Sequence, residues 1–197
     1  LALQVGGSNK DELSEVAKIA EDMGYDEINI NLGCPSKKVQ KNMFGACLMK
    51  EPDLVAEGIN SMVNSCKIPV TAKTRIGFDD IEDFEYLNKF IHKLRDAGTN
   101  TFILHARKAM LSGLTPKQNL NIPKLNYSMV YDVKKVVSRM PNFVKFYAYY
   151  AYSKSMCKHC IKVGILCLSV PRSETISGCT QMCHLHRFLL ISRPGQL

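Results

Sequence analysis

The segment Glu27-Ile-Asn-Ile-Asn-Leu-Gly-Cys-Pro-Ser36 is the most informative about the fold, because a strand-like run ends there abruptly in a turn. Apolar and polar side chains alternate from residue 27 to residue 32, which is the period of a β-strand. Gly33 permits turn conformations, and Pro35 keeps Cys34 out of the helical region. The sequence therefore predicts a thiol at the carboxyl end of a strand, where α/β folds place their chemistry. The alternative is that Cys34 is a small buried hydrophobe, as most free cysteines are.

Strands and helices alternate through the first 140 residues. Apolar runs predict strands at residues 1–5, 27–32, 69–73 and 101–105, and helical periodicity predicts helices at about residues 11–23, 53–63, 82–97 and 129–137. We also expect a polar loop at residues 36–40 and a helical stretch at residues 46–49. Strands that alternate with helices imply right-handed crossovers and a parallel sheet.

Each predicted strand ends in a chemically capable group. These groups are Gln4, Asn31 with Cys34, Lys73, and His105 with Arg107. Polar residues at the carboxyl ends of successive parallel strands are typical of the active face of a (β/α)8 barrel. Taken alone, Lys73 is equally compatible with a surface lysine, and His105 with a hydrogen-bonded core histidine.

The positive charge belongs mostly to the end of the chain. Of 26 Lys/Arg and 18 Asp/Glu in the whole sequence, residues 141–197 hold 7 and 1, which leaves 19 and 17 for residues 1–140. The net charge of +8 is therefore weak evidence for nucleic-acid binding by the main body. Three cysteines in the body fit a reducing compartment, and no apolar run reaches the ~20 residues that would span a membrane.

Six motifs resemble the tRNA-dihydrouridine synthases, specifically the A-type subgroup. They are Leu3–Ser8, Asn31–Ser36, Gly45–Met49, Lys73–Gly77, His105–Ala109 and Leu111–Lys117, and the resemblance covers residues 1 to about 140. It implies an FMN-bearing barrel that uses NADPH to reduce uridines in the D-loop of tRNA. In the family, hydride passes from the reduced flavin to C6 of uracil, and a cysteine protonates C5.

The resemblance also implies roles for single residues. The motif makes Cys34 the proton donor and leaves Cys47 to helix packing, and a thiol suits the role because it is mostly protonated at neutral pH. The residues that match flavin contacts are Gln4, Lys73 and His105, and a cation such as Lys73 would stabilise the reduced anionic ring. Asn31 and Lys117 match tRNA contacts, with Arg107 as a further phosphate or flavin contact. Leu120 stands where the subgroup usually has a basic residue that contacts tRNA.

The expected fold is an α/β fold in which residues 1–140 form a partial TIM (β/α)8 barrel, about strands two to five or six of eight. An irregular, poorly folded tail is expected over residues 141–197. The family's Asn-Gly-Gly and Gly-Arg motifs, which grip the flavin phosphate, do not appear in the sequence. We therefore expect a fragment with two exposed sheet edges and weak FMN binding.

The tail has the outline of a zinc site. Cys157 and Cys160 form a C-x2-C pair, and Cys179, Cys183, His184 and His186 follow. The second cysteine pair is spaced by three residues, however, and no glycine turn accompanies it. Translation beyond a splice boundary or in a shifted frame also explains this composition, and we expect no metal site.

The leading hypothesis is FMN- and NADPH-dependent reduction of tRNA uridine, with tRNA as the partner and no membrane or stable protein partner. The alternative is a catalytically inactive, truncated remnant without bound flavin. A cytoplasmic location is expected, with an organelle as the open alternative. Flavin absorbance near 450 nm, a property of the cofactor, would separate the two hypotheses.

Overall fold

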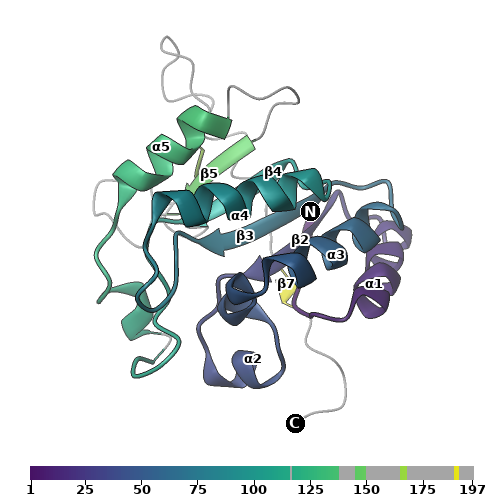
Figure 1. Ribbon diagram of the computed structural model, residues 1–197. Coiled ribbons are helices and arrows are strands. Elements are labelled where there is room, and N and C mark those ends of the chain that lie inside the picture. Colours follow the sequence, from purple (N-terminus) through teal and green to yellow (C-terminus); the bar gives the residue numbers. More distant parts are fainter. Residues whose placement is uncertain (116, 138–144, 150–164, 168–188, 191–197) are drawn as a thin grey trace.

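The computed structural model describes residues 1–115 and 117–137, together with the backbone of three strands further along the chain (Figure 1). Four strands belong to the first part: β1 (Ala2–Val5), β2 (Glu27–Leu32), β3 (Val70–Arg75) and β4 (Thr101–His105). The three later strands are β5 (Lys145–Tyr149), β6 (Ile165–Cys167) and β7 (Leu189–Leu190). All seven belong to one sheet.

The sheet is parallel through its centre. Its strand order is β6-β5-β4-β3-β2-β1-β7, so β1 to β5 lie side by side in chain order, and each pairs parallel with the next. The α/β fold and the parallel sheet predicted from the sequence are confirmed. Strand β7 pairs parallel with β1, and β6 pairs antiparallel with β5.

The tail differs from the expectation of an irregular segment, because it contains β5, β6 and β7. The two edges of the described sheet are therefore β6 and β7, and not β1 and β5. The sequence signal was weak here, since β6 has three residues and β7 has two. The remaining tail residues, among them all six zinc candidates, lie outside the described part of the chain.

Four helices connect the strands or follow them: α1 (Lys10–Asp22), α3 (Pro52–Val63), α4 (Phe84–Asp96) and α5 (Tyr127–Val137). Local sequence sets their ends. The Asn9 side chain accepts hydrogen bonds from the N–H groups of Asp11 and Glu12, which caps α1, and Gly24 follows this helix with a φ of +76°. The Asp83 side chain caps α4 in the same way.

Three short elements complete the described fold: α2 (Lys37–Lys41), η1 (Gly45–Lys50) and η2 (Gln118–Leu120). The prediction of a polar loop at residues 36–40 is wrong, because the helix α2 begins directly after Ser36. Lys38 and Lys41 lie in its last turn, where positive charge is favourable. The helical stretch predicted at residues 46–49 is part of the 3-10 helix η1.

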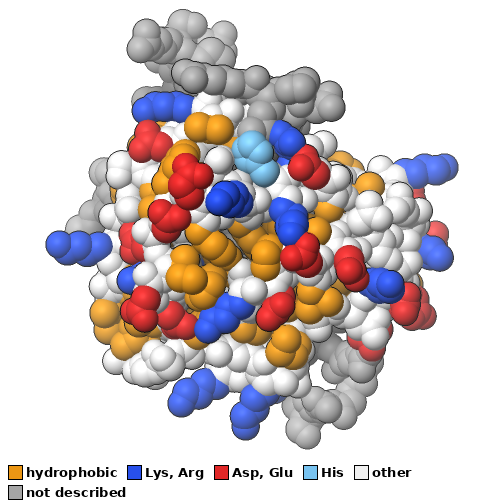
Figure 2. All heavy atoms as spheres, viewed as in Figure 1, with side chains coloured by type: hydrophobic (Ala, Val, Ile, Leu, Met, Phe, Trp, Pro, Cys, Tyr) orange, Lys and Arg blue, Asp and Glu red, His pale blue; other side chains and the backbone are white. Residues whose placement is uncertain are grey.

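The core lies between the helices and one face of the sheet. Alternate strand residues such as Leu3, Ile30 and Leu104 belong to one buried apolar cluster with Leu13 of α1 and Phe90 of α4. Figure 1 shows α3 and α4 side by side over the sheet. Figure 2, from the same side, shows lysine, arginine and acidic side chains mixed with apolar ones on this outer surface. None of the described helices is both long and apolar enough to cross a membrane.

Candidate active site

The other face of the sheet is polar. Strand register places Gln4 beside Asn29, Asn29 beside Thr71, Asn31 beside Lys73, and Arg75 beside His105. Because side chains two residues apart in a strand share a face, all of these side chains lie on the face opposite the apolar cluster. Four of the residues predicted from the sequence, Gln4, Asn31, Lys73 and His105, are thereby brought onto one surface.

A chain of hydrogen bonds orders the side chains of this polar face. The Thr71 hydroxyl donates to Glu27 Oε1 at 2.8 Å, and Thr71 Oγ1 accepts from Asn29 Nδ2 at 2.8 Å. Gln4 Nε2 then donates to Asn29 Oδ1 at 2.7 Å, and Asn31 Nδ2 donates to Gln4 Oε1 at 3.4 Å. A carboxylate can only accept, so Glu27 sets the donor direction of the whole chain.

The backbone of Cys34 is held on both sides. Asn31 Oδ1 accepts the N–H groups of Gly33 and Cys34, each at 3.1 Å, and the carbonyl of Cys34 accepts from the N–H of Ala46 at 2.9 Å. Gly45 has a φ of +77°, and a Cβ built there would lie 2.6 Å from the Cys34 carbonyl oxygen. The motif therefore needs glycine at this position. Cys34 itself is a free, half-buried cysteine.

Positive groups gather around His105. Burial lowers the pKa of His105 most, the charges of Arg75, Lys73 and Arg107 add to this shift in that order, and together they bring the pKa to about 2. His105 is therefore neutral across the physiological range. Burial and the charge of Arg75 lower the pKa of Lys73 to about 8, while Cys34 opposes this shift. Such a cluster favours an anionic ligand.

Two predicted contacts lie on the chain that follows β4, which we call the post-β4 segment (residues 106–115 and 117–126). Arg107 is buried, and its Nη1 donates to the carbonyls of Asn121, at 3.2 Å, and Pro123. Burial also lowers its pKa. Lys117 is exposed immediately before η2, so the structure does not gather it with the buried polar groups.

Sequence reasoning missed Arg75, a buried side chain that binds three backbone carbonyls. Its Nε donates to Gly33 at 2.9 Å, and its Nη1 donates to Lys108 at 3.1 Å and to Asn119 at 3.0 Å. The signal was present, because Arg75 lies two residues beyond Lys73 and therefore on the same face of the strand.

The other two described cysteines are partly buried and pack against the apolar core. The thiol of Cys47 donates to the carbonyl of Phe44 at 3.2 Å, and burial raises the pKa of Cys47 and of Cys66. Within the described residues, no group of three or more His, Cys, Asp or Glu side chains could hold a metal ion.

The family model for dihydrouridine synthases matches residues 1–144. The chain belongs to the dihydrouridine synthase family. Over 135 residues it is 54% identical to the tRNA-dihydrouridine(20/20a) synthase of Pasteurella multocida. The aligned stretch covers 68% of this chain and 41% of that relative. The enzyme of the same name from Synechocystis is 51% identical over 135 residues, and the one from Escherichia coli is 53% identical over 136. The chain thus spans about two fifths of the length of these synthases.

A solved structure shares the fold. It is described as a candidate phosphonomutase from Burkholderia cenocepacia, and it matches 83% of this chain and 60% of its own with a TM-score of 0.53. The sequence identity is 16%, so this likeness concerns the fold alone. It agrees with the parallel α/β arrangement of the dihydrouridine synthase segment described above.

Proposed function

We propose that residues 1–140 form part of a TIM (β/α)8 barrel that reduces uridine to dihydrouridine in tRNA, with FMN as cofactor and NADPH as reductant. The observation that carries the proposal is the polar face of the sheet. The family match coincides there with a buried row of amide, cationic and imidazole side chains beside a half-buried cysteine. The 54% identical relative is named a tRNA-dihydrouridine(20/20a) synthase, which supports assigning this activity to the polar face.

The residues present fit a flavin. Gln4, Lys73 and His105 lie on one face of three strands, and the mutual repulsion of the cations around His105 would be relieved by an anionic group. We propose that these three side chains hold the ring of FMN. Bound FMN would supply hydride to C6 of uracil and would be reduced again by NADPH.

We propose that Cys34 holds the proton that C5 of uracil receives. Its thiol is half-buried, its backbone is fixed by Asn31 and Ala46, and it interacts electrostatically with Lys73. A fixed donor reduces the entropy that must be lost on reaching the transition state.

We propose that RNA contacts involve Asn31 and Lys117, with Arg107 as a further phosphate or flavin contact. Asn31 is half-buried beside Cys34, and exposed Lys117 offers a charge for a backbone phosphate. Arg107 keeps a buried Nε for which the described residues provide no hydrogen-bond partner, and a phosphate or flavin oxygen would satisfy that donor.

The experiment is reduction of an unmodified tRNA transcript by the purified chain with added FMN and NADPH, with dihydrouridine measured by mass spectrometry of the nucleosides. Because weak FMN binding is expected, FMN is kept in excess, and binding is measured by fluorescence titration of FMN with the protein. We expect saturable binding, and dihydrouridine to form only when both FMN and NADPH are present. A colourless preparation that yields no dihydrouridine at saturating FMN would contradict the proposal and favour the inactive remnant.

A further inference from the structure

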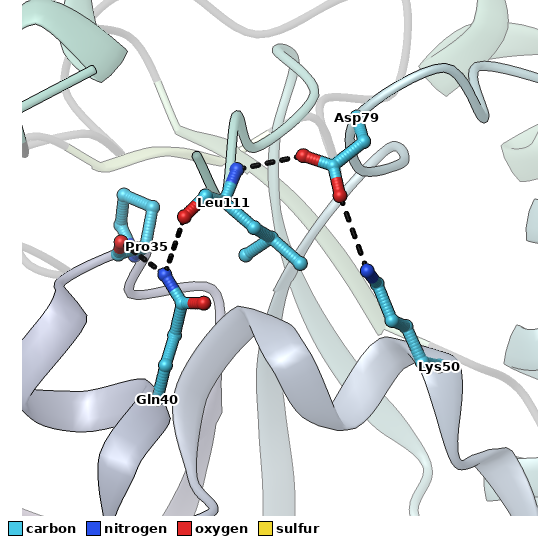
Figure 3. A network of polar contacts seen from close by, with 5 residues as sticks. All are labelled: Pro35, Gln40, Lys50, Asp79 and Leu111. Carbon is cyan, nitrogen blue, oxygen red and sulfur yellow. Dashed lines mark hydrogen bonds and ion pairs between the residues drawn. The ribbon is translucent and has the colours of Figure 1, made fainter. Parts of the chain in front are cut away.

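The backbone on both sides of Cys34 is tied to the post-β4 segment. On one side, Arg75 bridges the carbonyl of Gly33 to those of Lys108 and Asn119. On the other side, Gln40 Nε2 donates to the carbonyl of Pro35 at 2.9 Å and to the carbonyl of Leu111 at 2.8 Å. Figure 3 shows Gln40 of α2 between these two carbonyls.

Leu111 is held from its other side as well. Its N–H donates to Asp79 Oδ1 at 2.8 Å, and Asp79 Oδ2 accepts from Lys50 Nζ at 3.2 Å (Figure 3). Asp79 has a φ of +46°, which residues other than glycine rarely adopt, and its N–H donates to the carbonyl of Ala109 at 2.8 Å. Leu111 is therefore a fixed point where segments following β2, β3 and β4 meet.

Only a side chain with two hydrogens on one atom can make both bonds of Gln40. Its NH2 group has two hydrogens, and both face carbonyl acceptors. A glutamate has the same size but only acceptors, so it would turn both contacts into repulsions. These contacts therefore require the two N–H donors of the amide, and a side chain of equal volume without donors cannot make them.

We propose that Gln40 is a positioning residue that couples the Cys34 backbone to the post-β4 segment, so that RNA held by this segment at Lys117 sets the position of the Cys34 thiol. The RNA part rests on the function proposed above. The coupling part does not, because it concerns contacts within the chain.

The coupling is tested first without RNA. The rate of Cys34 alkylation by iodoacetamide is measured by peptide-resolved mass spectrometry, with Cys66 as the internal reference. Loss of two hydrogen bonds predicts that Gln40→Glu raises the Cys34 rate about tenfold and leaves the Cys66 rate unchanged. Hydrogen exchange over residues 109–115 should rise in the same variant.

Two further variants serve as controls. Gln118→Glu is the matched substitution, because Gln118 Oε1 is an acceptor for the N–H and hydroxyl of Thr115, and a carboxylate keeps both bonds. It should stay within about twofold of wild type. Gln40→Met removes the donors without adding charge and should reproduce the effect of Gln40→Glu. It also provides the test if Gln40→Glu fails to fold. Wild-type Cys34 rates in both Gln40 variants, or faster alkylation of Cys34 and Cys66 together, would overturn the coupling.

The RNA part is tested by adding tRNA transcript to the same assay. We expect tRNA to change the Cys34 rate in wild type and to have little effect in Gln40→Met. With FMN and NADPH present, kcat should fall about tenfold in this variant while FMN affinity stays unchanged. If tRNA has no effect on wild type although Gln40→Met still exposes Cys34, the coupling stands and the RNA part of the inference fails. The proposed reduction of tRNA uridine fails only if wild type also forms no dihydrouridine with FMN and NADPH. If tRNA shifts both proteins equally, the role given to Gln40 fails.

Discussion

The two faces of the parallel sheet are built from the same strands and have opposite chemistry. Toward the helices, Ile28, Ile30 and Leu32 of β2 lie in the apolar cluster, whereas Asn29 and Asn31 of the same strand join the hydrogen-bond chain. Even apolar Ile103 lies outside the cluster, because it belongs to the polar face. The apolar face stabilises the fold through burial, and the polar face stabilises it only while each donor keeps its acceptor.

The largest expected effect comes from a change on the apolar face. Phe102 is fully buried in β4 and belongs to the core cluster. Phe102→Ala should lower the free energy of unfolding by about 3–5 kcal/mol, because it removes buried surface and leaves a cavity. Urea unfolding followed by far-UV circular dichroism measures this. A loss under about 1 kcal/mol would show that the helices do not close over this face.

A change in the middle of the polar face should cost less. Thr71→Val keeps the shape of the side chain but leaves the Nδ2 of Asn29 without its acceptor and Glu27 without a donor. We expect a loss of about 1–3 kcal/mol in the free energy of unfolding. Thr71→Ser keeps the hydroxyl and should recover most of this loss. Equal stability of the Val and Ser variants would argue that the hydrogen-bond chain contributes nothing.

Acid should weaken the polar face through His105. The unfolded chain binds a proton at this residue near pH 6.5, whereas the folded protein binds it only near pH 2, so stability falls as the pH drops below 6.5. Between pH 7.5 and 5.5 the contribution of His105 is a loss of about 1.4 kcal/mol. His105→Gln should make the urea midpoint of unfolding less dependent on pH over that range.

Lys73 should have the same sign of effect at alkaline pH. Its pKa is about 8 in the folded protein and about 10.5 in the unfolded chain, so stability should rise as the pH increases from 8 to 10.5.

The smallest effect on stability is expected from a change on the protein surface. Lys117 lies on the surface, so Lys117→Ala should change the free energy of unfolding by less than about 0.5 kcal/mol. If Lys117 contacts a phosphate, Lys117→Ala should lower tRNA affinity. The slope of log affinity against log salt concentration should also become shallower by about one. Fluorescence titration at several salt concentrations measures both. An unchanged salt slope would remove Lys117 from the RNA contacts.

The sequence was most informative where the chemistry is local. Strand alternation predicted β2, helical periodicity predicted α1, and the end of each parallel strand indicated Gln4, Lys73 and His105 as polar residues on one face. These features depend on neighbours within a few positions along the chain, or on strand direction alone.

The rest depends on contacts between distant residues. Gln40 and Leu111 are 71 positions apart, and Asp79 and Leu111 are 32 apart, so no local pattern indicated that they meet. The helix α2 was missed because its five polar or β-branched residues, Lys-Lys-Val-Gln-Lys, lack an apolar stripe. The strands β5 to β7 are short, and they pair with strands that are distant in the sequence or already part of the sheet, so local sequence alone did not indicate them.

A pair of cysteine variants tests whether Cys34 is the proton donor in the uridine reduction proposed for the polar face. Cys34→Ala and Cys47→Ala are compared for dihydrouridine formed in tRNA at saturating FMN and NADPH, with flavin content measured in the same samples. We expect Cys34→Ala to lose product formation by at least about a hundredfold while retaining flavin, because general acid catalysis contributes about that much. Cys47→Ala should stay close to wild type, since Cys47 packs against the core. Near-normal product from Cys34→Ala, or loss of product in Cys47→Ala with flavin retained, would rule out Cys34 as the proton donor.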